Sequence, residues 1–187
     1  MNDAHMQFCA SEDWRTIVHE SILPVALRDV ELGDEAIEIG PGPGFTTDIL
    51  RTRTAHLTAV ELDEGLAAAL ARRLAGGNVD VVVGDATALD FGAGRFTGAA
   101  SFHMLHHIAP AQAQDRAFAE LARVLVPGGV LVAADGVYSE GSAAFHQDDT
   151  YNPIAPEDLE GRLTAVGFGS VRVHTHDLGW VCTARAG

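Results

Sequence analysis

The feature that most constrains the fold of this chain is the glycine-rich run at residues 38–44, Glu-Ile-Gly-Pro-Gly-Pro-Gly. It separates an apolar segment at 36–39 from a helix-forming segment that starts at Phe45. A glycine-rich turn between a strand and a helix is typical of α/β folds, where it lets a ligand approach the backbone without meeting a Cβ atom. We therefore expect a ligand-binding strand–turn–helix unit here, the alternative being a tight turn that binds nothing.

The spacing of this turn indicates which ligand it takes. The glycines follow a G-x-G-x-G pattern, because Phe45 comes directly after Gly44, whereas dinucleotide sites use G-x-G-x-x-G. Pro41 and Pro43 also remove two backbone N–H donors that a phosphate cradle would use. The run thus predicts a nucleoside site whose ligand needs no pyrophosphate.

Apolar, β-branched runs alternate with helical patterns along the rest of the chain, which indicates a mostly parallel sheet with crossover helices. Strands are expected at 36–39, 57–62, 79–83, 98–102, 130–135, 170–176 and 180–185, and helices near 45–53, 65–75, 112–125 and 156–166. Only Asp177, Leu178 and Gly179 separate the last two strands, so we expect an antiparallel hairpin. The fold class is α/β, a Rossmann-like doubly wound seven-stranded sheet with one reversed strand.

A helical segment precedes the first strand. Ser11, followed by two acidic residues, resembles a helix start, and this helix should run to about Leu23 and break at Pro24, with a short second piece to Val30. We expect residues 1–30 to form a helical cap or lid and residues 31–187 to form the core of what is overall one domain.

Composition limits the function classes. A length of 187 residues with 47% hydrophobic residues suits one domain with a real core. No apolar window is long enough for a membrane span, no export signal is visible, and two cysteines make no disulfide framework, which favours a cytoplasmic protein with reduced thiols. The net charge is −14, and lysine is absent, which argues against a nucleic-acid substrate. The absence of lysine among many Ala, Arg, Asp and Gly residues suggests a GC-rich bacterial source.

Two carboxylates follow later strands at the edge where open α/β sheets bind ligands. Glu61 ends the second strand and can accept both hydroxyls of a ribose; the alternative, a solvated acid that caps the next helix, suits Asp63 and Glu64 better. Asp85 ends the third strand and can accept a hydrogen bond from an adenine amino group, although Gly-Asp is also a common turn.

With these residues in order, the chain resembles a class I S-adenosylmethionine-dependent methyltransferase of the small-molecule, type 11 branch, over nearly its whole length. The run Met104-Leu105-His106-His107-Ile108 and the Pro127-Gly128-Gly129 turn add to the likeness. The resemblance implies strand order 3-2-1-4-5-7-6, S-adenosylmethionine as cofactor and S-adenosylhomocysteine as product. It implies the following cofactor-binding residues: Glu38, Gly40, Pro41, Gly42, Gly44, Glu61, Leu62, Asp85, Ala86 and Phe102.

The chain departs from related patterns at two places. Thr97 stands where that branch often has an acid before the fourth strand. The loop and the segment around Glu61 also resemble ribosomal RNA adenine dimethylases, but those enzymes carry Asn-Pro-Pro-Tyr after the fourth strand, where this chain has Ser101-Phe102-His103-Met104. Together with the acidic charge, this difference disfavours a nucleic-acid amine as the methyl acceptor.

The histidines supply the candidate base. His103 leaves the fourth strand beside the expected methyl position, so it is the candidate catalytic residue, the alternative being a structural hydrogen bond. The resemblance implies structural roles for His106 and His107. His146 with Asp148 and Asp149, or His174 with His176, have incomplete ligand sets, so we expect solvated polar residues and no metal site.

The function expected is methyl transfer to a small, partly apolar metabolite by a monomer or homodimer with no membrane partner. Two segments could cover the acceptor: residues 8–27, with Phe8, Trp14 and Ile17, and residues 136–153, with Tyr138, Phe145 and Tyr151. The alternative functions are a non-catalytic S-adenosylmethionine-binding protein and, less favoured, an NAD-dependent oxidoreductase or an RNA methyltransferase.

Overall fold

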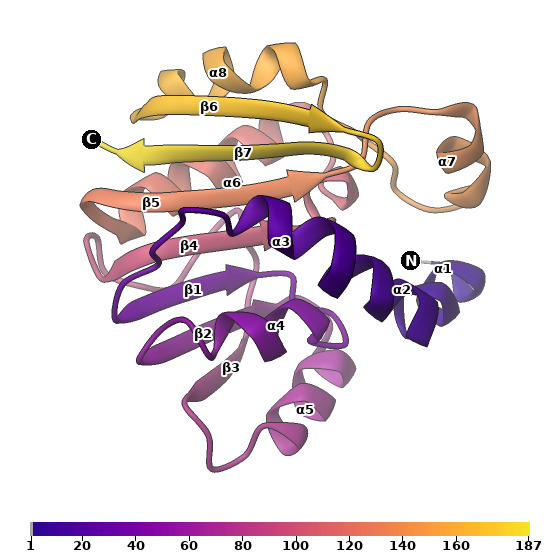
Figure 1. Cartoon of the computed structure of the whole chain (residues 1–187), viewed down its shortest axis with the longest axis horizontal. Helices are drawn as coiled ribbons and strands as arrows, with labels where there is room; N and C mark the ends of the chain where they lie inside the picture. The colour runs from indigo at the N-terminus through magenta and orange to yellow at the C-terminus, as the bar shows by residue number, and fades with distance from the viewer. Residues whose placement is uncertain (1) are drawn as a thin grey trace.

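The computed structural model describes residues 2–187, so Met1, the first residue of the expected cap, lies outside the described residues. The described chain forms one seven-stranded sheet in the order β3-β2-β1-β4-β5-β7-β6 (Figure 1). The strands are β1 (Glu35–Ile39), β2 (His56–Glu61), β3 (Val79–Val83), β4 (Phe96–Phe102), β5 (Leu125–Asp135), β6 (Phe168–His176) and β7 (Gly179–Ala186). β7 runs antiparallel to both β5 and β6, and the other pairs of neighbouring strands are parallel, which confirms the predicted fold class and strand order.

The predicted helices are present with slightly different ends. They are α4 (Phe45–Leu50), α5 (Glu64–Arg73), α6 (Ala111–Val124) and α8 (Pro156–Ala165). The elements that were not predicted are α1 (Asp3–Cys9), a 3-10 turn (Leu105–His107) and α7 (Glu140–Phe145). None of the helices in residues 2–187 combines the length and apolarity that crossing a bilayer requires.

The N-terminal helix differs from its prediction at Pro24. Ser11 caps α2 (Glu12–Ile17) as expected, since its hydroxyl oxygen accepts a bond from the Trp14 N–H at 3.1 Å. The helix does not break at Pro24 but continues through a π-helical turn (Val18–Ile22) into α3 (Leu23–Ala26). Pro24 lies in the first turn of α3, a position where proline is tolerated because its missing N–H is not needed there. In the wider π-helical turn before it, the Leu23 N–H donates to Val18 O, so the chain continues as a helix up to the proline.

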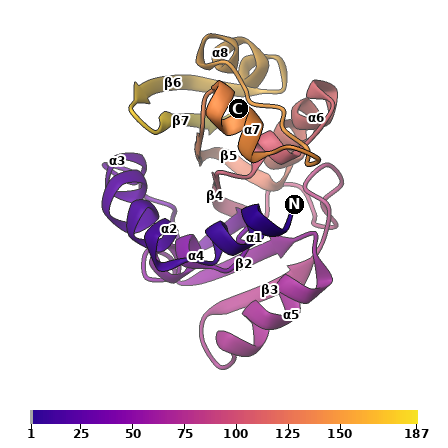
Figure 2. The same ribbon diagram turned by 90° about the vertical axis from the view of Figure 1, so that its right-hand side faces the viewer.

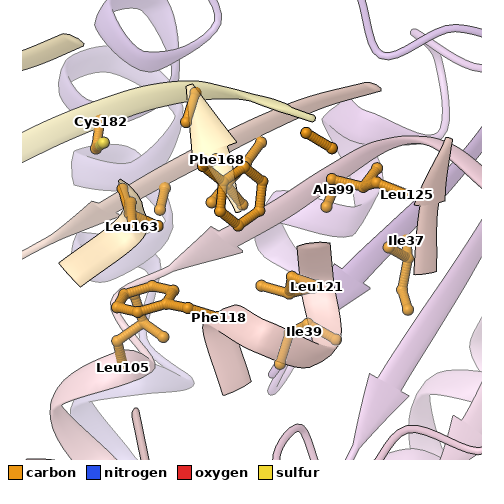
Figure 3. Close-up of a cluster of buried hydrophobic side chains, with 14 of the residues drawn as sticks. Ile37, Ile39, Ala99, Leu105, Phe118, Leu121, Leu125, Leu163, Phe168 and Cys182 are labelled. Carbon is orange, nitrogen blue, oxygen red and sulfur yellow. The ribbon is translucent and has the colours of Figure 1, made fainter. Parts of the chain in front are cut away.

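Two hydrophobic layers sandwich the sheet. On one face, Phe118 and Leu121 of α6 and Leu163 of α8 pack against Ile37 and other strand residues, as Figure 3 shows. On the other face, the helices from α2 to α4 pack over the strands in a second buried cluster, and α3 and α4 lie in front of the sheet in Figure 1. Successive strand residues alternate between these layers, so the residue that follows each strand is carried to a fixed place at the sheet edge.

The carboxyl ends of the parallel strands meet at one edge, which faces the viewer in Figure 2 with α1, α2 and α7 in front of it. Ile39 at the end of β1 pairs with Val60 of β2 and Ser101 of β4, so the segments that follow these three strands begin side by side. Asn2, which caps α1, joins this helix to the end of α7, because its side-chain amide nitrogen donates to Phe145 O and Gln147 O, each at 3.1 Å.

Candidate active site

The glycine-rich turn has a backbone that glycine alone tolerates well. Gly40, Gly42 and Gly44 all have positive φ angles, of 67°, 54° and 89°. A Cβ on Gly40 would overlap Met104, and one on Gly44 would overlap Leu70 and Arg73, whereas nothing lies within 4 Å of a Cβ on Gly42. Two of the glycines are therefore needed by the protein's own packing, and Gly42 leaves open space next to the turn.

Glu38 lies beneath this turn and supports it. Its side chain is buried and accepts hydrogen bonds from the hydroxyls of Thr46, at the start of α4, and Thr47, the latter at 2.6 Å. Burial raises the pKa of Glu38 to about 7, although both threonine bonds act in the opposite direction. The carboxyl group thus joins β1 to α4 and sets the path of the turn between them.

Glu61, the expected ribose ligand, is joined to the same turn. Its Oε2 accepts the Gly42 N–H and its Oε1 accepts the Asp63 N–H, both at 3.0 Å. Each carboxylate oxygen keeps a second lone pair, so both can still accept from a diol. Asp63 caps α5, because its side chain accepts the Leu66 N–H at 2.9 Å, as the sequence predicted.

The ends of β2 and β3 offer an apolar surface beside an acid. Leu62, which follows the buried strand β2, is 69% exposed, and Val83, the last residue of the edge strand β3, is 52% exposed. Asp85 is exposed, and its Oδ1 accepts bonds from the backbone and hydroxyl of Thr87, both at 2.8 Å. Apolar walls with a nearby acceptor suit a purine ring that carries an amino group. Ala86 is half-buried next to Asp85.

His103 stands at the end of β4 in a strained conformation, with φ of 50°. Its N–H donates to Ala134 O at 2.8 Å, and its ring makes an edge contact with Trp14, the centroids 5.0 Å apart. Burial lowers the pKa of His103 to about 4 against the opposing charge of Asp135, so the ring is neutral at pH 7. The preceding residue, Phe102, is the last residue of β4 and is buried in the core.

His103 lines a cavity of about 190 Å³ between α1 and α7, here called the α1–α7 cavity. Four aromatic residues from the two expected cover segments line it: Phe8, Trp14, Phe145 and Tyr151. The segments also touch each other, since the rings of Phe8 and Phe145 are 5.6 Å apart. Both segments thus contribute to one enclosure, while Ile17 and Tyr138 are not among its lining residues.

The cavity also brings together histidines that the sequence left apart. His5, His106 and His146 line it, and His107 lies beside them. Asp149 bonds to His5, and His174 is an exposed residue of β6. Burial, reinforced by neighbouring histidines, lowers the pKa of His5, and it lowers that of His107 to about 3. The sequence did not single out His5, because no local pattern marks it.

Both cysteines are free thiols, consistent with the expectation of no disulfide framework. Cys9 lines the α1–α7 cavity, and burial raises its pKa to about 11. Burial likewise raises the pKa of Cys182, in the core, to about 12. Both sulfurs are protonated at neutral pH, which makes them poor nucleophiles.

Known proteins similar to this chain agree with the arrangement. A family model for a methyltransferase domain matches residues 37–133, just over half of the chain. An S-adenosylmethionine-dependent methyltransferase from Thermotoga maritima superimposes with a TM-score of 0.75 at 18% identity, covering 100% of both chains. Another from Mesorhizobium loti gives 0.72 at 15% identity, covering 87% of this chain and 95% of that one.

A curated relative, ribosomal RNA small subunit methyltransferase A from Methylibium petroleiphilum, is 39% identical over 102 residues. That match covers 48% of this chain and 39% of the relative, so the chain spans well under half of that protein's length.

Proposed function

The chain belongs to the class I S-adenosylmethionine-dependent methyltransferases, and on that premise we propose that it methylates a small, partly apolar acceptor held in the α1–α7 cavity. The observation that carries the proposal is the aromatic lining of this cavity beside the glycine-rich turn. Gly40 N–H bonds to Val60 O at 2.9 Å, and Met104, next to His103, packs against Gly40. Met104, the residue that follows the cavity-lining His103, therefore lies against the turn.

The residues at this edge fit the cofactor of the family. Glu61 would hold the ribose, Leu62, Asp85 and Ala86 the adenine, and the open side of Gly42 the amino-acid portion, with Glu38 fixing the turn from below. When bound, S-adenosylmethionine supplies an activated methyl group on a sulfonium, so the protein need only position an acceptor in line with it.

His103 is the proposed base for acceptors that must lose a proton, such as a hydroxyl. The neutral ring can accept that proton, and the edge contact with Trp14 and the backbone bond to Ala134 fix its orientation. An acceptor whose nucleophile carries a free lone pair needs no such base, and the aromatic lining alone would then serve to position it.

The curated relatives favour a second candidate, an RNA acceptor. Against it stand the net charge of −14 and the absence of lysine, because RNA binding requires clustered cations. We therefore place the small acceptor first.

The test is a transfer assay with S-adenosylmethionine labelled in the methyl group. Parallel reactions contain a metabolite extract or ribosomal RNA. We expect label in small molecules and none above background in RNA; label in RNA alone would overturn the proposal.

A variant separates the chemistry from cofactor binding. His103→Asn suits the positive φ, which asparagine tolerates, and should lower turnover of a hydroxyl acceptor about 100-fold or more with unchanged S-adenosylhomocysteine affinity. Trp14→Phe, which keeps an aromatic ring beside His103, is the control and should retain most of the activity.

A further inference from the structure

Four histidines converge at the α1–α7 cavity from three separate segments, and together they form what we call the histidine cluster: His5, His106, His107 and His146. His5 comes from α1, His106 and His107 from the 3-10 turn after β4, and His146 from the residue that ends α7. One ring nitrogen from each lies within 4.8 Å of those of the other three. Their rings are close, with centroids 4.1 Å apart for His106 and His107 and 4.4 Å apart for His5 and His146.

Hydrogen bonds fix which nitrogen of three of these rings carries the proton. His146 Nδ1 lies 2.6 Å from Ser142 O, a carbonyl that can only accept, so Nδ1 is the protonated atom. His106 Nδ1 lies 2.5 Å from Asp135 Oδ1, and His5 Nδ1 lies 3.2 Å from Asp149 Oδ2. In the neutral tautomer each ring therefore keeps its lone pair on Nε2, away from its hydrogen-bond partner.

Two of these lone pairs are buried without a partner. His106 and His146 are only 7% and 8% exposed, and their Nε2 atoms have no hydrogen-bond partner among the described residues. Leaving a buried acceptor unsatisfied costs about 1–3 kcal/mol, and here two such atoms occur within one cluster of rings. A shared cation would satisfy both atoms at once.

The acceptors behind the rings match the surroundings of metal-binding histidines. Such ligands almost always donate their second ring nitrogen to a carboxylate or a backbone carbonyl, which fixes the tautomer and the ring orientation. Asp135 is buried and held in place by the N–H groups of His106, at 3.0 Å, and Gly136, at 2.7 Å. Two carboxylates and one carbonyl thus support three of the four rings.

We propose that the histidine cluster binds one divalent transition-metal ion, Zn²⁺ being the best match to four neutral imidazoles, and that the ion joins α1 and α7 to the end of β4. Four nitrogens in a tetrahedral Zn²⁺ site lie about 3.4 Å apart, so binding would draw the rings together by about an ångström. Two of the three segments, α1 and α7, lie in front of the sheet edge (Figure 2). Three of the ligands, His5, His106 and His146, line the same α1–α7 cavity that is proposed to hold the acceptor, but none of them has a role in the proposed methyl transfer.

The test uses the full-length protein treated with a chelator and then titrated with Zn²⁺ against a chromophoric competitor, without cofactor. We expect one equivalent to bind and the thermal midpoint to rise with free Zn²⁺. Co²⁺ in place of Zn²⁺ should give the visible absorption of a tetrahedral nitrogen site.

Variants test each layer of the site. His146→Gln and His107→Asn should weaken Zn²⁺ binding about 100-fold or more and change the Co²⁺ spectrum, while Asp149→Asn, behind His5, should weaken it about 10- to 100-fold. His174→Asn, on exposed β6, is the matched control and should bind like the wild type. Circular dichroism checks that each variant is folded.

Two results would overturn the proposal. One is that the wild-type protein binds less than one equivalent of Zn²⁺ even when the free Zn²⁺ concentration is far above that which saturates ordinary zinc sites. The other is a set of folded cluster variants whose Zn²⁺ affinity and Co²⁺ spectrum equal those of His174→Asn.

Discussion

At the scale of single residues, the carboxylate of Glu61 is proposed to accept hydrogen bonds from two sets of donors, one in the protein and one in the cofactor. It accepts two backbone N–H groups of the protein and, in the proposed complex, the ribose hydroxyls. Glu61→Gln replaces one acceptor by an amide donor that faces an N–H group. We expect S-adenosylhomocysteine to bind at least about tenfold more weakly in calorimetric titration, which corresponds to about 1.4 kcal/mol.

Asp63→Asn is the matched control for Glu61→Gln, because it removes the same charge two residues away and asparagine still caps α5. Equal losses of affinity in the two variants would mean that general charge, not the Glu61 contacts, governs binding.

Glu38 gives the stability of the protein a defined pH dependence. Its folded pKa is raised from 4.5 to about 7, so the folded state holds a proton that the unfolded chain has released. The contribution of protonated Glu38 to the free energy of unfolding is therefore fully present below about pH 4.5 and is lost as the pH rises through 7. In Glu38→Gln this loss disappears, so relative to the wild type the variant should gain on the order of 3 kcal/mol between pH 4 and pH 8.

Urea unfolding at the two pH values measures this gain, and Glu31→Gln, an exposed acid, serves as the reference for loss of a surface charge. A difference between Glu38→Gln and the wild type that stays constant with pH would show that Glu38 is ionised throughout.

At the scale of elements, two glycines of the glycine-rich turn are expected to serve different purposes: Gly44 allows close packing within the protein, and Gly42 leaves room for the cofactor. Gly44→Ala places a Cβ against Leu70 and Arg73, so thermal unfolding should occur several degrees lower. The Cβ of Gly42→Ala would lie in open space, so this variant should lose only about 1–2 kcal/mol of folding stability, which is what a positive φ costs a residue with a side chain. We expect Gly42→Ala instead to impair S-adenosylhomocysteine binding, and equal thermal midpoints in the two variants would contradict this division.

The cover made by α1 and α7 depends on aromatic contacts that are partly open to solvent. Phe8 is 37% exposed, and its ring lies 5.5 Å from that of Trp14 and 5.6 Å from that of Phe145. Phe8→Ala should raise KM for the acceptor found in the extract several-fold and leave S-adenosylhomocysteine affinity unchanged. Met6→Ala, on the same helix and 44% exposed, is the control; a similar rise in KM there would mean that α1 as a whole, not its aromatic face, matters.

Strong local patterns explain why some elements were predictable from sequence and others were not. Proline at the start of α8 and Asp63 before α5 mark their helices directly. By contrast, α1 and α7 are short and lack an apolar period, and they are defined by caps, Asn2 and Ser139, that resemble ordinary loop residues. The prediction at Pro24 was wrong because a π-helical turn, which has no simple sequence pattern, absorbs the proline.

At the scale of the whole molecule, the sheet order followed from the alternation of strands and helices together with the family resemblance, since right-handed crossovers leave few topologies. The glycine-rich turn, Glu61 and Asp85 could be placed together because the carboxyl ends of parallel strands share one edge. The histidine cluster could not, because its members lie as far apart in sequence as His5 and His146 and meet only through the folded covers.

If the methyl group is delivered into the α1–α7 cavity, a crystal structure with S-adenosylhomocysteine bound will show it most directly. We expect Glu61 to contact the ribose and the sulfur to face the cavity, on the side where His103 and Trp14 line it. A sulfur that faces away from this cavity, or a ligand bound elsewhere on the sheet, would mean that the methyl group is delivered to another site.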